Sequence, residues 1–205
     1  MSRVKISSTD FVDFINKKGT RKITKVKEVN NRGEYNPAFD FYRGLRNQII
    51  DTLKYNRESV NITDYVNELN DSKKRANYDN VSKGFLKFLK KNNYSWVNPN
   101  QGLYEISELS INVNPEVGLS IKGELYLVKL YFKDDNLGKE EAQVFLNLMQ
   151  QTLCDGIFKD YKCALLDLRK GKLHKHNHKE FIEDLFMAEA ETFISLWKGI
   201  NRKSA

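Results

Sequence analysis

The sequence predicts an α+β fold in which a helical N-terminal lobe packs on a mixed core. In the first half of the chain, apolar residues recur at spacings of three and four, the period of helices that bury one face. After the turn-rich stretch SWVNPNQG the pattern changes to strand-like alternation, and near residue 138 it returns to the helical period. We therefore expect a helical lobe over residues 1–70 and a mixed core over residues 71–205.

The lobe is predicted to contain short helices. The polar residues 8–10 can cap a helix that carries Phe11, Phe14 and Ile15 on one face. In TRKITKVKEV, residues 20–29, apolar residues are interspersed with basic ones, which indicates a strand or an extended arm. Residues 39–53 form an amphipathic helix entered through Pro37, and residues 61–69 resemble another short helix.

The core is predicted to run in the order helix, three-stranded meander, helix, strand, C-terminal helix. Its elements, as the periodicity defines them, are a helix over 72–92, strands over 103–113, 116–121 and 124–132, a helix over 138–153, an inner strand from 163, and a helix over 179–198. The run CALLDLRKGKL is almost continuously apolar and ends in charge, as expected of an inner strand. Since no linker-like segment divides the chain, we expect the lobe to pack on this core.

Composition places the chain among ordinary globular proteins. Of its 205 residues, 40% are hydrophobic and 30% are charged, which allows a sizeable core and argues against extensive disorder. No run approaches the roughly 18 apolar residues of a membrane span, and the first residues lack the apolar region of a secretory signal. We expect a cytoplasmic protein without a membrane partner, in which Cys154 and Cys163 are reduced packing residues.

The net charge of +7 is compatible with a polyanionic partner such as nucleic acid, and equally with a lysine-rich solubilising surface. Two segments concentrate basic residues with few acids between them, and we predict that they contact backbone phosphates. The first contains Lys17, Lys18, Arg21, Lys22, Lys25, Lys27 and Arg32; the second contains Arg169, Lys170, Lys172, Lys175 and Lys179. A looser group, Lys83, Lys87, Lys90 and Lys91, fits a solvated helix face. Tyr35, Tyr94 and Trp96 either stack on unpaired bases or serve as packing residues.

The segment NPEVGLSIKGELYLVKLYFKDD is predicted to fold back as a β-hairpin. If Lys122 and Gly123 form a two-residue turn, the register places Glu116 opposite Lys129. Alternation along a strand then puts both side chains on one face, where Gly118 leaves room for a ligand or another backbone. The alternative is an ordinary cross-strand ion pair on a solvated sheet edge.

The order helix, three strands, helix, strand resembles the core of the PD-(D/E)XK nuclease superfamily over roughly residues 72–170. Pro115-Glu116 and Lys129 fall where the family motif would lie. The resemblance implies a site in which acidic residues bind Mg²⁺ or Mn²⁺, and the metal and Lys129 activate water for attack on a phosphodiester. The segment GEYNPAFDFYRGLR also resembles a segment of uncharacterised bacterial proteins, a likeness that implies no activity.

The sequence departs from the nuclease motif at Leu127, the position two residues before the lysine, where active members carry an acid. Glu124 has the wrong parity and should point to the opposite face. Among possible substitutes we take Asp167, in the later strand, as the second metal ligand beside Glu116, so that the catalytic set would be Glu116, Lys129 and Asp167. Other candidates are Glu105, Glu108 and Asp79.

The remaining motifs give weaker indications of function. His174, His176 and His178 in KLHKHNHKE could hold a transition metal in an extended chain, or form a solvated loop among lysines. P-loop, dinucleotide-binding, zincin and paired C-x-x-C motifs are not found in the sequence, which argues against those enzyme classes.

Three functions follow as hypotheses. The first is a nucleic-acid-binding protein with a degenerate, non-catalytic nuclease-like core. The second is an active metal-dependent nuclease of DNA or RNA with a relocated carboxylate. The third is a protein-interaction module that regulates a nucleic-acid enzyme and meets an acidic groove on its partner.

Overall fold

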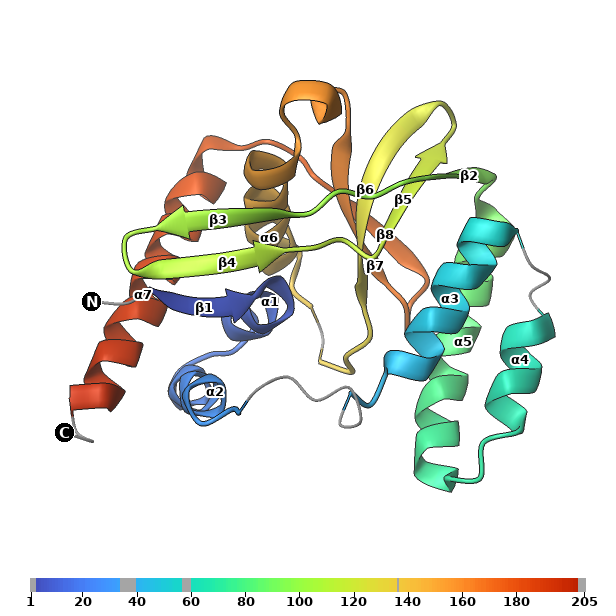
Figure 1. The fold of residues 1–205 in the computed structure, drawn as a ribbon, viewed down its shortest axis with the longest axis horizontal. Coiled ribbons are helices and arrows are strands. Elements are labelled where there is room, and N and C mark those ends of the chain that lie inside the picture. Colours follow the sequence, from blue (N-terminus) through green and yellow to red (C-terminus); the bar gives the residue numbers. More distant parts are fainter. Residues whose placement is uncertain (1–2, 34–39, 57–59, 136, 203–205) are drawn as a thin grey trace.

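The computed structural model describes residues 3–33, 40–56, 60–135 and 137–202, and it has the predicted α+β class (Figure 1). Within these residues the strands form two sheets, one of order β2-β5-β6-β7-β8 and one of order β1-β4-β3. In the described parts of the chain we find no helix both long and apolar enough to cross a membrane.

The larger sheet is mixed. Its strands are Tyr94–Val97 (β2), Val117–Ile121 (β5), Glu124–Tyr131 (β6), Lys162–Asp167 (β7) and Lys172–Lys175 (β8). β6 and β7 run parallel, whereas the other neighbouring strands are antiparallel. Because parallel neighbours need a crossover, the chain passes from β6 to β7 through helix α6, Lys139–Leu153, and the short 3-10 helix η2, Gly156–Phe158.

The smaller sheet joins the N-terminus to the middle of the chain. Its strands are Val4–Ser7 (β1), Gly102–Ile106 (β3) and Leu109–Val113 (β4). β3 and β4 form a hairpin, whose turn includes Ser107 at a φ of +50°, and β1 lies parallel to β4. In chain order this hairpin stands between β2 and β5 of the larger sheet.

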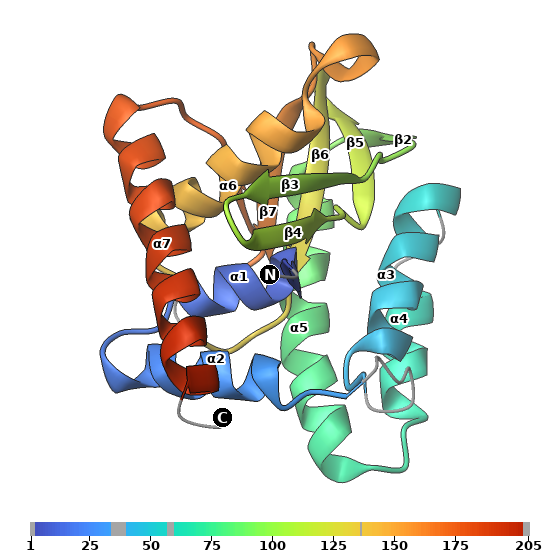
Figure 2. The same cartoon turned by 60° about the vertical axis from the view of Figure 1, so that its left-hand side comes forward.

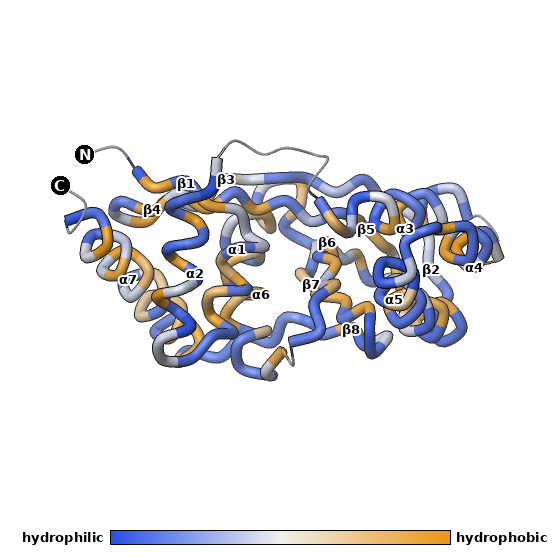
Figure 3. Tube along the Cα trace, turned by 90° about the horizontal axis from the view of Figure 1, so that it is seen from below, coloured by the Kyte–Doolittle hydropathy of each residue, from blue (hydrophilic) through white to orange (hydrophobic). Residues whose placement is uncertain are grey.

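Helices cover both faces of the larger sheet (Figures 1 and 2). On one face lie α3 (Arg43–Tyr55), α4 (Val60–Asn67) and α5 (Ser72–Lys91), which share an apolar core with Val128 and Leu166. On the other face lie α1 (Ser8–Ile15), α2 (Thr20–Asn30), α6 and α7 (Glu180–Arg202), which share a second core with Leu127 and Leu165. Seen from below, apolar residues lie along β6 and β7, between these two groups of helices, and along α6 on one side of them (Figure 3).

The predicted strand or extended arm over residues 20–29 is wrong, because this segment is the helix α2. Ile23, Val26 and Val29 are spaced by three, which also fits a helix. Val26 is fully buried, whereas Ile23 is exposed. Of the two basic residues between them, Lys27 is exposed but Lys25 is buried, so the apparent alternation came from a narrow apolar stripe.

The predicted three-stranded meander is also corrected. Residues 103–113 form the hairpin β3-β4 in the smaller sheet, and the neighbour of β5 is β2, which overlaps the stretch expected to be a turn. Strands β1 and β8 were not predicted, each being four residues long. The helices expected over residues 8–15, 61–69, 72–92 and 138–153 form within one or two residues of the predicted bounds, and the one expected over 179–198 continues four residues further, to Arg202.

Residues 1–70 contribute to both cores. β1, α1 and α2 belong with α6 and α7, whereas α3 and α4 pack with α5 on the opposite face of the larger sheet. The helix expected to begin through Pro37 starts at Arg43, and Pro37 itself lies outside the described residues.

Candidate functional site

Glu116 and Lys129 form a largely buried ion pair at the end of the β5-β6 hairpin. Lys129 Nζ lies 2.6 Å from Glu116 Oε1 and donates a second hydrogen bond, of 3.1 Å, to the carbonyl oxygen of Asn114. The other carboxylate oxygen, Oε2, accepts the backbone N–H of Leu130 at 2.9 Å. Lys129 is only 4% exposed. Both oxygens of Glu116 therefore already have protein donors.

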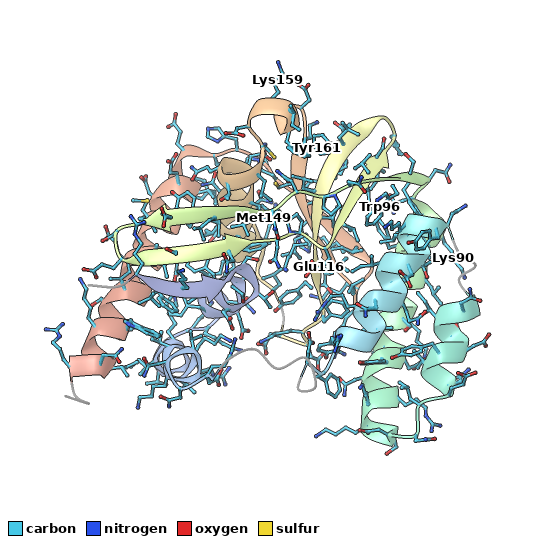
Figure 4. The ribbon with its side chains drawn as sticks, in the orientation of Figure 1. Lys90, Trp96, Glu116, Met149, Lys159 and Tyr161 are labelled. Carbon is cyan, nitrogen blue, oxygen red and sulfur yellow. The ribbon has the colours of Figure 1, made fainter. Side chains whose placement is uncertain are left out.

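The register that brings this pair together was predicted correctly. Val117 pairs with Val128 and Ile121 with Glu124, so Lys122 and Gly123 form the two-residue turn, both at positive φ. The hairpin is not the solvated sheet edge of the alternative interpretation, because β2 and β7 flank it. The room expected above Gly118 is taken by β2: a Cβ there would lie 2.4 Å from the carbonyl oxygen of Val97. Figure 4 shows Glu116 near the middle of the molecule.

Leu127, at the position where the resemblance implies an acid, belongs to the core. Its side chain is fully buried in the cluster that α6 and α7 cover. Glu124 instead engages Lys162 and Tyr126 at the other end of β6. The hydrogen bond from Lys162 is the main cause that lowers the pKa of Glu124 to about 2. Neither residue can complete a carboxylate cluster around Lys129.

Asp167 lies on the same face as Lys129 but further along the sheet. Lys129 pairs in register with Leu165, and Asp167 pairs with Tyr131. The side chain of Asp167 is buried; its Oδ1 accepts the backbone N–H of Lys170 at 3.1 Å, and its Oδ2 lies 3.6 Å from Lys170 Nζ. Asp167 therefore caps the turn that leads from β7 to β8.

The other acids proposed as substitutes form ion pairs elsewhere on the molecule. Glu105 pairs with Arg3, Glu108 with Lys198 and Asp79 with Lys83. No group of three or more metal-ligating side chains occurs within the residues that the structure describes. A Mg²⁺ or Mn²⁺ ion prefers several carboxylate or water oxygens, and the residues around Lys129 do not fit this requirement.

The first basic segment contributes to an internal network of charges between α1 and α2. Lys25 is buried, and its Nζ lies 3.0 Å from Asp10 Oδ1 and 2.8 Å from Asp13 Oδ2. Arg32 holds Asp10 through two hydrogen bonds of 2.9 Å, and Lys133 Nζ lies 2.5 Å from Asp13 Oδ2. Because Lys25 is buried and paired with two carboxylates, it is not available as the phosphate contact that the sequence predicted.

The network shifts the ionisation of its members. Burial opposes the charge on Asp10, but hydrogen bonds from Arg32 and the charge of Lys25 outweigh it and lower the pKa to about 2. Asp13 is affected in the same way: its burial is outweighed by Lys133 and Lys25, so that its pKa is lowered. For Lys25 the two carboxylates outweigh burial and raise the pKa. The network is thus fully charged near neutral pH.

The remaining cations of this segment differ in whether they have an ion-pair partner. Lys17 is paired with Asp135, and Lys22 with Glu189 of α7. The other three, Lys18, Arg21 and Lys27, are exposed, and within the described residues their side chains form no ion pair or hydrogen bond. Lys18 and Arg21 line a surface hollow of about 210 Å³, together with Asn16, Lys17 and Asp135.

The second basic segment is largely structural. Arg169 donates to the carbonyl oxygen of Phe132 at 3.0 Å and to Asn77 Oδ1 at 2.9 Å, which ties the end of β7 to α5. Lys170 lies beside Asp167, and Lys175 lies over the ring of Tyr126 with Nζ 4.6 Å from its centroid. Lys172 is exposed on β8. This segment presents fewer free cations than its sequence indicated.

The three histidines do not gather into a metal site. His174 belongs to β8, and His176 and His178 follow it. Burial lowers the pKa of both His174 and His176. The segment is therefore not wholly the solvated loop of the alternative interpretation, since a strand reaches as far as Lys175 and His176 N–H bonds to the carbonyl oxygen of Cys163.

The aromatic residues proposed for base stacking are packing residues where the structure describes them. Tyr94 and Trp96 on β2 are partly buried against the core shared with α5 (Figure 4 labels Trp96). Tyr35 lies outside the described residues.

Cys154 and Cys163 are free thiols, as expected, but they are not isolated: their Sγ atoms lie 3.6 Å apart.

Sequence reasoning missed the acids of α1 and the residues around Tyr131. Asp10 and Asp13 are the charged positions of an otherwise largely apolar helix, STDFVDFI, and that isolation could have indicated a buried ion pair. Burial, and then the carboxylates of Asp13 and Asp135, raise the pKa of the Tyr131 hydroxyl. Tyr131 lies two residues after Lys129 on β6, and its buried hydroxyl has no hydrogen-bond partner among the described residues.

Comparison of this chain with protein-family models, with curated proteins and with solved structures found no match.

Proposed function

We propose that this protein binds nucleic acid through a basic surface carried on a nuclease-like core that has lost catalysis. The contrast between two sets of charges carries the proposal. The acid and the lysine of the nuclease motif neutralise each other inside the protein, with Lys129 4% exposed. In contrast, Lys18, Arg21 and Lys27 lie at the surface, around and along α2, without ion pairs in the described parts of the chain.

The chain topology supports the nuclease-like part of the proposal. Helix α5 precedes β2, the strands β2, β5 and β6 lie side by side, and α6 leads to β7, parallel to β6. With the β3-β4 hairpin regarded as an insertion, this is the order of helix, three strands, helix and strand that the resemblance implies. The position of Glu116 just before the second strand and of Lys129 near the end of the third also supports it.

The loss of catalysis is argued from the chemistry of the site. Metal-assisted hydrolysis needs open oxygen ligands and a water beside the metal. Both oxygens of Glu116 accept hydrogen bonds from Lys129 and Leu130, and Leu127 offers no ligand. Since Asp167 caps a turn through the N–H of Lys170, its carboxylate is also in use. We expect no cleavage of DNA or RNA with Mg²⁺ or Mn²⁺.

The test is a salt titration of binding. Affinity for single-stranded, duplex and structured oligonucleotides is measured by fluorescence anisotropy at several salt concentrations, with wild type and two triple variants. In Lys18→Ala/Arg21→Ala/Lys27→Ala we expect weaker binding and a slope of log K against log salt reduced by about 2–3, since each phosphate contact contributes roughly 0.7–0.9. The matched control, Lys87→Ala/Lys90→Ala/Lys91→Ala, loses the same charge from exposed positions of α5 and should keep the wild-type slope.

Three outcomes would reject parts of this proposal. Affinity that does not change between low and moderate salt removes nucleic-acid binding through phosphates. An equal loss of slope in both triple variants removes the assignment to the α2 surface, because only net charge would then matter. Cleavage of any substrate with Mn²⁺ that disappears in Glu116→Gln removes the claim that catalysis is lost.

A further inference from the structure

The turn between α1 and α2 carries a concave site with excess positive charge. The hollow of about 210 Å³ is lined by Asn16, Lys17, Lys18, Arg21 and Asp135. Three cations against one carboxylate leave two positive charges in excess. Because Asp135 is already paired with Lys17, the excess resides on Lys18 and Arg21.

The hollow is held in shape by its surroundings. The turn contains Gly19 at a φ of +54°, and its backbone is fixed by hydrogen bonds from Lys17 N–H to Phe14 O and from Arg21 N–H to Lys18 O. Below it, Lys25 links α2 to Asp10 and Asp13 of α1. A Cβ added at Gly19 would meet nothing within 4 Å, so the space outside the turn is open. A ligand would therefore find the two cations on a preorganised backbone.

The chemistry of the hollow favours a phosphate group. An arginine presents a planar fork of donors that matches the oxygens of a phosphate, and a neighbouring lysine adds a point charge. A phosphomonoester carries about −1.5 to −2 charges at pH 7, which matches the excess of two positive charges. An internal phosphodiester carries one charge and is attached to nucleosides on both sides, so it fits an open surface better than a hollow.

We propose that this hollow binds the terminal phosphate of a nucleic-acid strand. The proposal rests on the proposed nucleic-acid binding and deepens it, because it makes the protein a reader of strand ends. The internal contacts along the backbone would then fall to exposed cations further along α2, such as Lys27. Whether the phosphate belongs to the 5′ or the 3′ end is a difference that the experiment resolves.

The experiment compares three oligonucleotides of one sequence, with a fluorophore at an internal base. One has a 5′-phosphate, one has a 3′-phosphate and one has hydroxyl groups at both ends. Anisotropy titrations at a single salt concentration should give a dissociation constant about 10-fold lower, or better, for one phosphorylated strand than for the hydroxyl-ended strand, the effect of one set of charged hydrogen bonds. Circular dichroism confirms the fold of every variant used.

Two variants locate the effect. In Lys18→Gln/Arg21→Gln the preference for the phosphorylated end should disappear. In Lys87→Gln/Lys90→Gln, which removes equal charge from α5, it should remain. Figure 4 shows Lys90 at the side of the molecule formed by α3, α4 and α5, away from α2.

The outcomes separate this inference from the proposed function. Equal affinity for all three strands with a steep salt dependence overturns the terminal-phosphate site and leaves nucleic-acid binding intact. A preference for one end that survives in Lys18→Gln/Arg21→Gln overturns the assignment to this hollow. If no strand binds at all, both proposals are wrong.

Discussion

Glu116 and Lys129 face each other across two antiparallel strands, with Oε1 and Nζ 2.6 Å apart, and together they close the end of the β5-β6 ladder. The second oxygen of Glu116 accepts the N–H of Leu130, just beyond the last backbone pair, Val117 with Val128. The carboxylate therefore continues the pairing that the backbone of β5 no longer supplies. The contacts of both carboxylate oxygens thus give this pair a place in the strand pairing itself.

Removing the lysine should destabilise the protein strongly. In Lys129→Met, Glu116 is left next to a buried apolar side chain, and we expect the free energy of unfolding to fall by about 3–5 kcal/mol, as for a broken buried ion pair. The double variant Glu116→Gln/Lys129→Met, which removes both charges, should recover part of this loss. Urea unfolding followed by circular dichroism gives the three values.

The same variants separate structure from binding. Where Lys129→Met remains folded, its affinity for oligonucleotides should equal that of wild type, because the pair lies inside the protein. A Lys129→Met protein as stable as wild type would contradict the role assigned to this pair.

The charge network of α1 predicts a loss of stability in acid. The pKa of Asp10 is about 2 in the folded protein against an ordinary value of 3.8. A folded-state pKa below the unfolded one stabilises the protein above the unfolded pKa, and this contribution is lost as the pH falls through about 4 toward 2. At neutral pH it amounts to about 2 kcal/mol, from 1.36 kcal/mol for each pKa unit.

The variant Asp10→Asn isolates this contribution. We expect it to be less stable than wild type by about 2 kcal/mol or more at pH 7, since Lys25 and Arg32 each lose a charged partner. The difference should narrow as the pH approaches 2, where Asp10 itself becomes protonated. Denaturant unfolding at pH 7, 4 and 2.5 measures it; a difference that stays constant across these values would show that Asp10 acts through shape and not through charge.

The sequence predicted correctly those features of the fold that local residue patterns determine. The Lys122-Gly123 turn sets the register that pairs Glu116 with Lys129, and the apolar period of α5 sets its face. The sequence did not predict pairings between distant segments, such as β1 with β4 or β2 with β5 across the inserted hairpin. Strands of four residues carry too few alternations to be recognised, and their partners are known only from the tertiary structure.

The candidate site, too, was predicted only where local patterns determine it. A turn and a period of two suffice to bring together one acid and one base on neighbouring strands. Whether a lysine is free or paired depends on residues that are remote in sequence: Lys133 reaches Asp13 over 120 positions, and Arg169 reaches Asn77 over 92. The division of the first basic segment into buried Lys25 and exposed Lys18 follows from such contacts.

The close packing of α5 on the turn after β7 gives a third prediction. A Cβ at Gly84 would lie 1.9 Å from the carbonyl oxygen of Leu168, an atom of the backbone that cannot rotate away. Gly84→Ala should therefore reduce the free energy of unfolding by about 1–3 kcal/mol or more, the usual effect of overpacking. The control is Gly199→Ala in α7, where a Cβ meets nothing within 4 Å and the higher helix propensity of alanine should stabilise by up to about 1 kcal/mol.

Thermal unfolding of both glycine variants measures the two effects. Opposite signs of the change in melting temperature are expected. A Gly84→Ala protein with the melting temperature of wild type would contradict the tight contact between α5 and Leu168.

The two thiols predict an intramolecular disulfide under oxidation. Their Sγ atoms are 3.6 Å apart, so a bond of about 2.05 Å requires only a small movement of the C-terminal end of α6. The hydrogen bond from Cys163 lowers the pKa of Cys154, whereas hydrogen bonding to Cys154 and burial raise that of Cys163. Because the thiolate is the reacting form, the half-buried Cys154 should react first with an added disulfide, and Cys163 should then displace the reagent.

Treatment with oxidised glutathione, followed by intact-protein mass spectrometry, tests this order. Each protein loses two hydrogen atoms when two molecules of reduced glutathione leave, and the monomer mass falls accordingly. In Cys163→Ser the second step is blocked, so the mixed disulfide on Cys154 should accumulate; in Cys154→Ser the buried Cys163 should stay unmodified. Disulfide-linked dimers in place of the closed monomer would refute the short distance between the two sulfur atoms.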